Sequence, residues 1–172
     1  MYGTSPIELL TTDAMDKGLI YCQNYVYSAQ WTAAGGNQLT ANGQIDAVTN
    51  INGDSDFVIQ RINYAAWSAV GTSITDPDYL VQVSIGGSAR LLFDKSISIQ
   101  AIFGNFLSNK VPNSLPFPYL VEMNNNLVTT LTNRTATAAD RVDVVFDGFR
   151  VFYQGERAPS ELRQQIFRKL AY

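Results

Sequence analysis

The sequence predicts an all-β fold, an antiparallel β-sandwich or jelly roll of about seven to nine strands with a short C-terminal α-helix. Nine Tyr, nine Phe and two Trp residues, together with many Val, Ile and Thr, favour strands. Apolar and polar residues alternate over several segments, as in half-buried strands. Turn residues separate these segments, and blocks rich in Leu, Ala, Lys and Glu, which are typical of helices, are missing.

The chain divides by pattern into three parts. We expect an N-terminal arm at residues 1–18, a β-sandwich domain at 19–154 and an amphipathic helix at 155–172. With 172 residues, of which 46% are hydrophobic, the chain is long enough to bury a core without a metal ion or a disulfide.

In the first half, an aromatic-rich segment at 19–31 predicts one or two strands, which end at the break Ala34-Gly35-Gly36-Asn37. A second strand region covers 38–51 and is interrupted by Asn42-Gly43, which is a hairpin signal only if its two flanks pair. Turn residues at 50–56 then precede a long apolar strand at 57–67.

The second half has clearer alternation. Residues 79–85 and 97–101 each alternate with period two and predict strands. Three prolines between Val111 and Tyr119 indicate an extended crossing segment that is not a central strand. A Thr-rich strand follows at 127–133. In the closing strand, 142–153, the apolar positions change phase at Gly148, where a bulge is expected to re-aim the strand.

The tail changes character after a break at 155–159. Ser160 is suited to cap a helix, and Glu161 is favourable at its positive end. Four apolar residues then fall on one helical face: Leu162, Ile166, Phe167 and Leu170. This stripe either packs on its own sandwich or docks on another subunit, and the sequence leaves both interpretations open.

Composition excludes several kinds of chemistry. The chain has no His and one Cys, Cys22, so intrachain disulfides, Cys-cluster metal sites and His-based triads cannot form. No phosphate-binding loop is present, and we expect no cofactor and no metal. The net charge of −3 and a pI near 4.8 argue against nucleic-acid binding. The apolar runs are too short to span a membrane.

Carboxylates offer two weak patterns. Acidic and amide residues alternate from Asn50 to Asp56, as in a calcium loop, but Gly53 is misplaced and Arg61 stands where a bidentate Glu is required. We therefore expect a turn that leads into a strand. Asp143 and Asp147 share one strand face, which we expect to be solvated. A hydrolase would require Asp54, Asp56, Asp76 or Asp78 to converge in a cleft, and we predict that the protein is not an enzyme.

Two features concern sugars. The aromatic residues Tyr25, Tyr27, Trp31, Trp67 and Tyr79 would form a stacking platform if several were exposed in one groove, but burial in the sandwich explains them more simply. The sequence Asn133-Arg134-Thr135 matches a glycosylation sequon, and we interpret it as an ordinary loop.

Three segments, taken in order, resemble small β-sandwich virion proteins of tailed bacteriophages, the accessory or decoration type attached to heads and necks. The first is Asn52-Gly53-Asp54-Ser55-Asp56-Phe57, followed by the strand 58–62. The second is Leu115-Pro116-Phe117-Pro118-Tyr119, followed by the strand 127–133. The third is the closing strand 142–152, with Asp147-Gly148-Phe149-Arg150-Val151-Phe152. The resemblance covers residues 46–153.

The resemblance implies a non-enzymatic structural role in the virion, in which the protein decorates or cements the capsid or head-tail region. Its partners would be the major capsid protein or neighbouring virion subunits, and we expect a homo-oligomer. No catalytic residue carries over. We expect the subunit contacts at the two termini, Tyr2 to Leu10 and Leu162 to Tyr172. The alternative is a carbohydrate- or receptor-binding β-sandwich of a phage fibre or spike.

Overall fold

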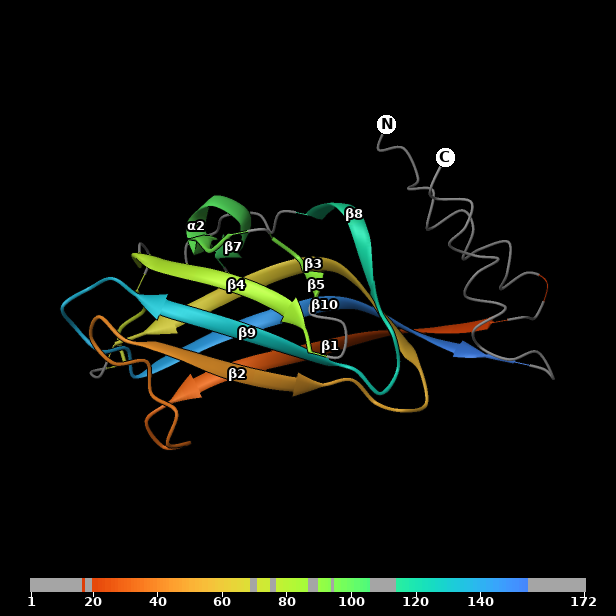
Figure 1. Cartoon of the computed structure of the whole chain (residues 1–172), viewed down its shortest axis with the longest axis horizontal. Helices are drawn as coiled ribbons and strands as arrows, with labels where there is room; N and C mark the ends of the chain where they lie inside the picture. The colour runs from red at the N-terminus through yellow and green to blue at the C-terminus, as the bar shows by residue number, and fades with distance from the viewer. Residues whose placement is uncertain are drawn as a thin grey trace.

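The computed structural model describes residue 17 and residues 20–68, 71–74, 77–86, 90–93, 95–105 and 114–154. Over these residues the chain is nearly all β, with two sheets stacked face to face (Figure 1). The predicted all-β sandwich is therefore confirmed. The C-terminal helix at 155–172 and all of the N-terminal arm except Lys17 lie outside the described residues, so both stay predictions.

The first sheet is built around three long antiparallel strands, β1 (Ile20–Thr32), β10 (Arg141–Tyr153) and β3 (Asp56–Trp67), in that spatial order. Two further strands pair with β3 on its other side. β8 (Ser114–Val121) is antiparallel to β3, and the two-residue strand β7 (Gly104–Asn105) is parallel to it. The proline-rich segment thus forms part of β8 at the margin of the sheet, where Pro is tolerated.

The second sheet has the order β2 (Gln44–Asn50), β9 (Asn126–Asn133), β4 (Tyr79–Ile85). The two-residue strands β5 (Arg90–Leu91) and β6 (Ile97–Ser98) both pair with β4. In Figure 1 this sheet lies in front of the first. Edge strands β1 and β2 lie beside each other across the sandwich, where the Thr49 hydroxyl donates to the Ser28 carbonyl at 3.2 Å.

The strand predicted at 97–101 is wrong beyond Ser98. A single helical turn, α2 (Ile99–Ile102), replaces its second half, and the Phe103 N–H donates to the Ile99 carbonyl at 3.0 Å. Residues four apart lie on one face of a helical turn, so Ile99 and Phe103 both enter the core, with 0% and 2% exposure. A period-two strand would also have placed them on one face, so alternation did not distinguish a strand from a helical turn.

Within the described residues, no helix is long and apolar enough to cross a membrane.

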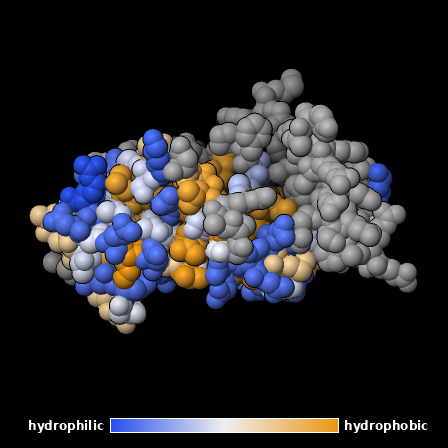
Figure 2. Space-filling model, in the orientation of Figure 1, coloured by the Kyte–Doolittle hydropathy of each residue, from blue (hydrophilic) through white to orange (hydrophobic). Residues whose placement is uncertain are grey.

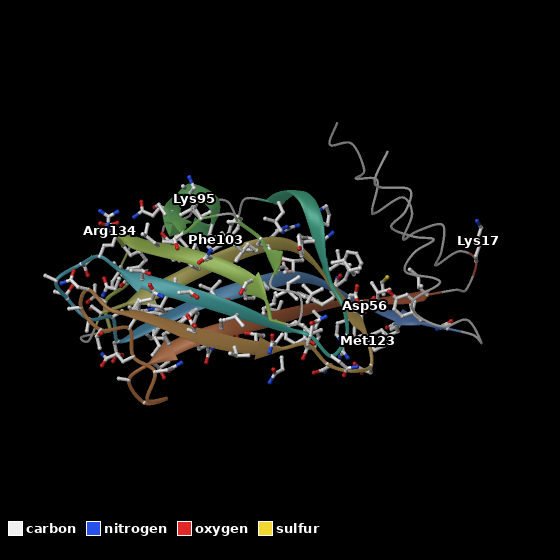
Figure 3. The ribbon with its side chains drawn as sticks, viewed as in Figure 1. Lys17, Asp56, Lys95, Phe103, Met123 and Arg134 are labelled. Atoms are coloured by element: carbon white, nitrogen blue, oxygen red, sulfur yellow. The ribbon has the colours of Figure 1, made fainter. Side chains whose placement is uncertain are left out.

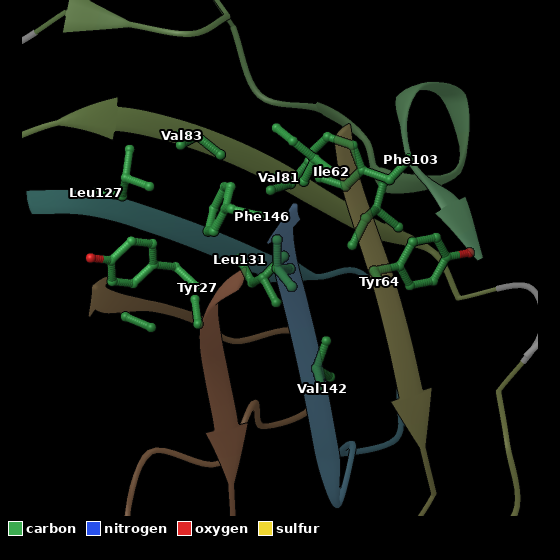
Figure 4. Close-up of a cluster of buried hydrophobic side chains, with 14 of the residues drawn as sticks. Tyr27, Ile62, Tyr64, Val81, Val83, Phe103, Leu127, Leu131, Val142 and Phe146 are labelled. Carbon is green, nitrogen blue, oxygen red and sulfur yellow. The ribbon is translucent and has the colours of Figure 1, made fainter. Parts of the chain in front are cut away.

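The main core lies between the sheets. Its largest fully buried side chains come from both: Trp31, Phe57, Tyr64, Tyr79 and Phe146. Strand β4 alternates strictly between buried and partly exposed residues, and so does β9. Figure 4 shows Val81, Val83, Leu127 and Leu131 of the second sheet facing the side chains of the first. Burial of each such apolar side chain contributes about 1.5–3 kcal/mol.

A second apolar cluster lies on the outer face of the first sheet. It contains Ile20, Val58, Phe149 and Val151. The pairing explains it: Gly148 lies opposite Ile59 and Asp147 lies opposite Arg61, so the extra residue is Gln60 of β3. The predicted irregularity at Gly148 is confirmed, but the prediction that it re-aims the closing strand is wrong. β10 keeps its alternation, and its apolar residues change phase because this end of the sheet buries its outer face too.

The surface combines small apolar areas with polar ones. The most exposed large hydrophobic residues of the described part are Tyr21, Val26, Val48 and Leu91. On the face shown in Figure 2, the coloured hydrophobic residues form separate areas among hydrophilic ones.

Gly148 is required by close backbone packing at the bulge. A Cβ atom there would lie 1.9 Å from the Val58 carbonyl oxygen and 2.9 Å from its carbonyl carbon. We expect Gly148→Ala to lower the free energy of unfolding by about 3 kcal/mol, because the backbone of β3 must shift. Urea unfolding followed by circular dichroism measures this loss.

Gly36→Ala is the control. Gly36 has φ +73°, and nothing lies within 4 Å of the position that an added methyl group would take. This variant should therefore lose only about 1–2 kcal/mol to backbone strain. Equal losses for the two variants would show that β3 and β10 are not closely packed at Gly148.

Candidate functional site

The most elaborate polar arrangement in the described part surrounds Arg150 of β10. Arg150 pairs in register with Phe57, an inward-facing core residue, and is itself only 8% exposed. Its Nε donates to Ser55 Oγ at 2.7 Å, and its Nη2 forms an ion pair with Asp54. Its guanidinium carbon lies 5.1 Å from the Tyr25 ring centroid and 4.8 Å from that of Phe152. We call Arg150, Asp54, Ser55, Tyr25 and Phe152 the Arg150 cluster.

The Arg150 cluster fixes the turn between β2 and β3 to β10. The Asp54 side chain is 59% exposed, and the hydrogen bond from Arg150 is the main cause that lowers the pKa of its carboxyl. The planar guanidinium suits this role because it can stack on rings while it donates in fixed directions. The positive charge is thereby neutralised by a residue of the same chain.

Asp56, the first residue of β3, also joins separate parts of the chain. It is fully buried, and its carboxylate accepts a hydrogen bond from the Met123 N–H at 2.8 Å and another from the Tyr153 hydroxyl. Figure 3 places Asp56 and Met123 at the same end of the sandwich. The expected turn into a strand is found here, since Asp56 begins β3. No group of three or more metal-ligating residues is present among the residues that the structure describes.

The carboxylates named for a hydrolase do not converge. Asp54 and Asp56 lie where β3 begins, whereas Asp78 precedes β4 at the opposite end and pairs with Arg134 at 3.7 Å (Figure 3). Asp76 lies outside the described residues. The three described carboxylates therefore form no shared cleft.

The predicted solvated face at Asp143 is wrong. Asp143 is 7% exposed, because it lies in the central strand of the sheet between Gln30 and Ala65. Arg141 covers it with two contacts, Nε to Oδ1 at 3.0 Å and Nη2 to Oδ2 at 2.6 Å. Asp147 does stay partly exposed, at 39% of its side chain, and lies 3.9 Å from Arg61.

The candidate sugar-stacking residues do not share a groove. Trp31, Tyr79 and Tyr27 belong to the core, with 0%, 1% and 8% exposure, as the simpler interpretation predicts. Of the remaining two, Tyr25 lies beside Arg150, and Trp67 lies beneath the Arg141 guanidinium at 5.1 Å. A carbohydrate site would have to use other residues.

Asn133 of the sequon is a structural residue. It is 1% exposed, and its amide nitrogen donates to the carbonyls of Thr40 at 3.0 Å and Thr137 at 2.8 Å. Its Oδ1 accepts the Thr135 N–H at 2.9 Å. The interpretation of the sequon as a loop is wrong for Asn133, which is the last residue of β9, and the nitrogen that a glycan would modify is already bonded.

Cys22, half-buried in β1, is not activated. Burial raises the pKa of its thiol to about 11, so the thiol stays protonated at neutral pH. The predicted partner-binding stripe, Leu162, Ile166, Phe167 and Leu170, and the segment Tyr2 to Leu10 lie outside the described residues. Comparisons with known proteins give no further residue roles, since no family model and no curated protein matches the chain.

Sequence reasoning did not single out the Arg150 cluster as a site. Arg150 and Asp54 are 96 positions apart, and no local pattern joins them. The one available signal in the sequence was Arg150 itself, a charged residue among the apolar residues of the closing strand.

Arg150→Lys tests whether the cluster holds the turn. Lysine keeps the charge but cannot donate to Ser55 and Asp54 while stacking between two rings. We expect a loss of about 1.5–3 kcal/mol in the free energy of unfolding, the usual range for hydrogen bonds to charged groups. Urea unfolding at pH 7 measures it.

Arg134→Lys is the matched control, because its ion pair with Asp78 joins side chains that are 58% and 56% exposed. Such pairs contribute about 0–1 kcal/mol. If both substitutions cost the same, the cluster contributes no more than a surface pair.

Asp54 should make stability depend on acid pH. Its pKa lies below the usual 3.8 in the folded chain, so its contribution is complete above that value and disappears as the pH falls through the lower folded value. Wild type should be more stable than Asp54→Asn at pH 7, and the difference should shrink on acidification below about pH 4. Urea unfolding across a pH series measures it. In an Arg150→Met background the pH-dependent difference should become much smaller, because Arg150 is the main cause of the lowered pKa. An unchanged difference there would contradict the assigned cause.

Proposed function

We propose that the protein is a non-enzymatic structural component of a tailed-phage virion, which decorates or cements the capsid or head-tail region through subunit contacts. One observation carries the proposal beyond the sequence. The turn 52–57, the proline-rich segment 115–119 and the closing strand 142–152, which carry the resemblance to phage virion proteins, come together around β3, although they are far apart in the chain. The strand 127–133 belongs to the other sheet as β9.

The pairing of β3 with β8 and β10 brings these segments together. The turn 52–56 leads directly into β3. Ile59 of β3 pairs with Tyr119 of β8 on one side and with Gly148 of β10 on the other. The segments therefore belong to one structural unit, which is the result expected if their order reflects a common architecture. This supports the proposal through the fold.

The polar chemistry of the described part also favours a scaffold role. Asp54, Asp56 and Asp143 are each bonded to groups of the same chain. A catalytic carboxylate pair must instead face a cleft with controlled separation. These carboxylates are used to join strands and turns.

The proposed partners are the major capsid protein or neighbouring virion subunits, and the proposed contact is the C-terminal stripe of Leu162, Ile166, Phe167 and Leu170. Buried on a partner, each side chain would contribute about 1.5–3 kcal/mol before the cost of association. A carbohydrate- or receptor-binding role in a fibre or spike is the second candidate. Burial of Trp31, Tyr27 and Tyr79 leaves it without the platform that favoured it.

Removal of residues 159–172 tests the anchoring role. The truncated chain should keep a folded sandwich, with unchanged far-ultraviolet circular dichroism, but should no longer co-sediment with phage particles when it is present during their assembly. The expected loss follows from the missing apolar stripe.

A matched pair of full-length variants separates anchoring from folding. Changing the four stripe residues to Ser should abolish co-sedimentation, whereas Arg163→Gln with Arg168→Gln should retain it. A truncated chain that unfolds would show that the stripe packs on its own sandwich. Full-length protein that never co-sediments with particles would contradict the virion proposal itself.

A further inference from the structure

Strand β1 forms one edge of the first sheet. It has 13 residues and pairs with β10 from Ile20 to Thr32 without a register shift. Among the strands that the structure describes, none pairs with its other side. A strand edge of this kind presents a row of backbone donors and acceptors that another strand can bind.

The outward groups of β1 belong to its even-numbered residues. Near its end, the Gln30 carbonyl accepts from Asn37 Nδ2 at 2.6 Å, and the Thr32 N–H donates to Asn37 Oδ1 at 3.1 Å. The N–H and C=O of one residue point to the same side of an antiparallel strand, and the side alternates from one residue to the next. The backbone groups of Cys22, Asn24 and Val26 therefore also point outward, away from β10.

Within the described residues, no other element covers the part of the edge from Cys22 to Val26, and we call this part the open edge. The Asn37 side chain covers Gln30 and Thr32, and the Thr49 hydroxyl reaches Ser28. Within the described part of the chain, no hydrogen bond from another element reaches the outward backbone of the open edge. Three consecutive outward residues are enough for a two-stranded contact.

The open edge also lacks the features that usually prevent strand association. β1 contains no charged residue and no Pro, and its pairing contains no bulge. Natural proteins commonly protect long edges with these devices. The edge strand of the second sheet, β2, is shorter, at 7 residues, and carries Asp46. Two hydrophobic side chains of β1 are exposed as well, Tyr21 at 50% and Val26 at 53%.

We propose that the open edge is a self-association surface, on which two copies of this chain pair β1 with β1 in antiparallel orientation about a two-fold axis at Asn24. In that register Asn24 lies opposite its own copy, Cys22 lies opposite Val26, and Tyr21 lies opposite Tyr27. The Asn24 side-chain amide thus lies opposite an identical amide, and the largely apolar side chains of the other pairs lie opposite each other. The three outward pairs each exchange two backbone hydrogen bonds.

A second copy fits this edge better than a different chain for two reasons. An uncharged strand brings no like charges together when it meets itself, and it offers no charge that would select a complementary partner. The two-fold arrangement also closes the assembly at a dimer, because it uses the same open edge on both chains. The proposal does not depend on the virion role, and it places self-association at β1 instead of the termini.

Light scattering over a concentration series of the full-length chain tests the surface. We expect a dimer whose dissociation constant rises by at least about tenfold in Val26→Lys, because a charge opposes pairing at a strand edge. Leu91→Lys is the matched control: Leu91 is 46% exposed but belongs to β5 on the far side of the second sheet, and dimerisation should not change. Far-ultraviolet circular dichroism checks that both variants fold.

Cross-linking tests the register. In a Cys22→Ala background, Asn24→Cys should form an intermolecular disulfide with oxidised glutathione, since opposed residues of a bonded antiparallel pair lie about 5.5 Å apart at Cα, within disulfide range. Val26→Cys in the same background should cross-link at least about tenfold more slowly, because position 22 lies opposite it. Comparable rates would overturn the register.

A chain that stays monomeric at every concentration, or a dimer that Val26→Lys leaves unchanged, would overturn the proposal. Neither result would bear on particle binding, which the truncation and stripe variants test separately.

Discussion

The antiparallel pairing of β10 with β3 positions the Arg150 cluster, Asp56 and the bulge at Gln60. It places Arg150 over the turn that precedes β3 and Tyr153 beside Asp56. Gln60 is the extra residue in this pairing, and Gly148 is the small residue that lets the two backbones approach there. β8 extends the same unit from the opposite side of β3. A substitution that shifts this register would therefore disturb the core, the turn and the outer apolar cluster together.

Charge is used sparingly and locally in this fold. Arg150 with Asp54 and Arg141 with Asp143 join neighbouring parts of one chain, and each arginine also stacks on an aromatic ring. Partly buried pairs of this kind leave a large cost when one partner is removed, because the other charge stays desolvated. They therefore specify which strand and turn belong together.

Association, in contrast, is proposed at surfaces without charge. The open edge of β1 would supply backbone hydrogen bonds between two copies, and the C-terminal stripe would supply apolar contact with a shell or a neighbouring subunit. The two surfaces would bind through different interactions, so different variants can test them separately. Their combination would describe a scaffold that pairs with itself and attaches to a larger assembly.

The sequence by itself determined the fold class and the position of several regular strands. Alternation placed β4 at 79–85 and most of β9 correctly, because a side-chain period of two is a local property of a strand. Only the tertiary structure decided that Asp143 is buried, that α2 replaces half of a strand, that Gln60 is the extra residue opposite Gly148, and that β1 forms an edge. Each of these depends on which distant segments come to lie against a strand, and alternation along one strand carries no information about its neighbours.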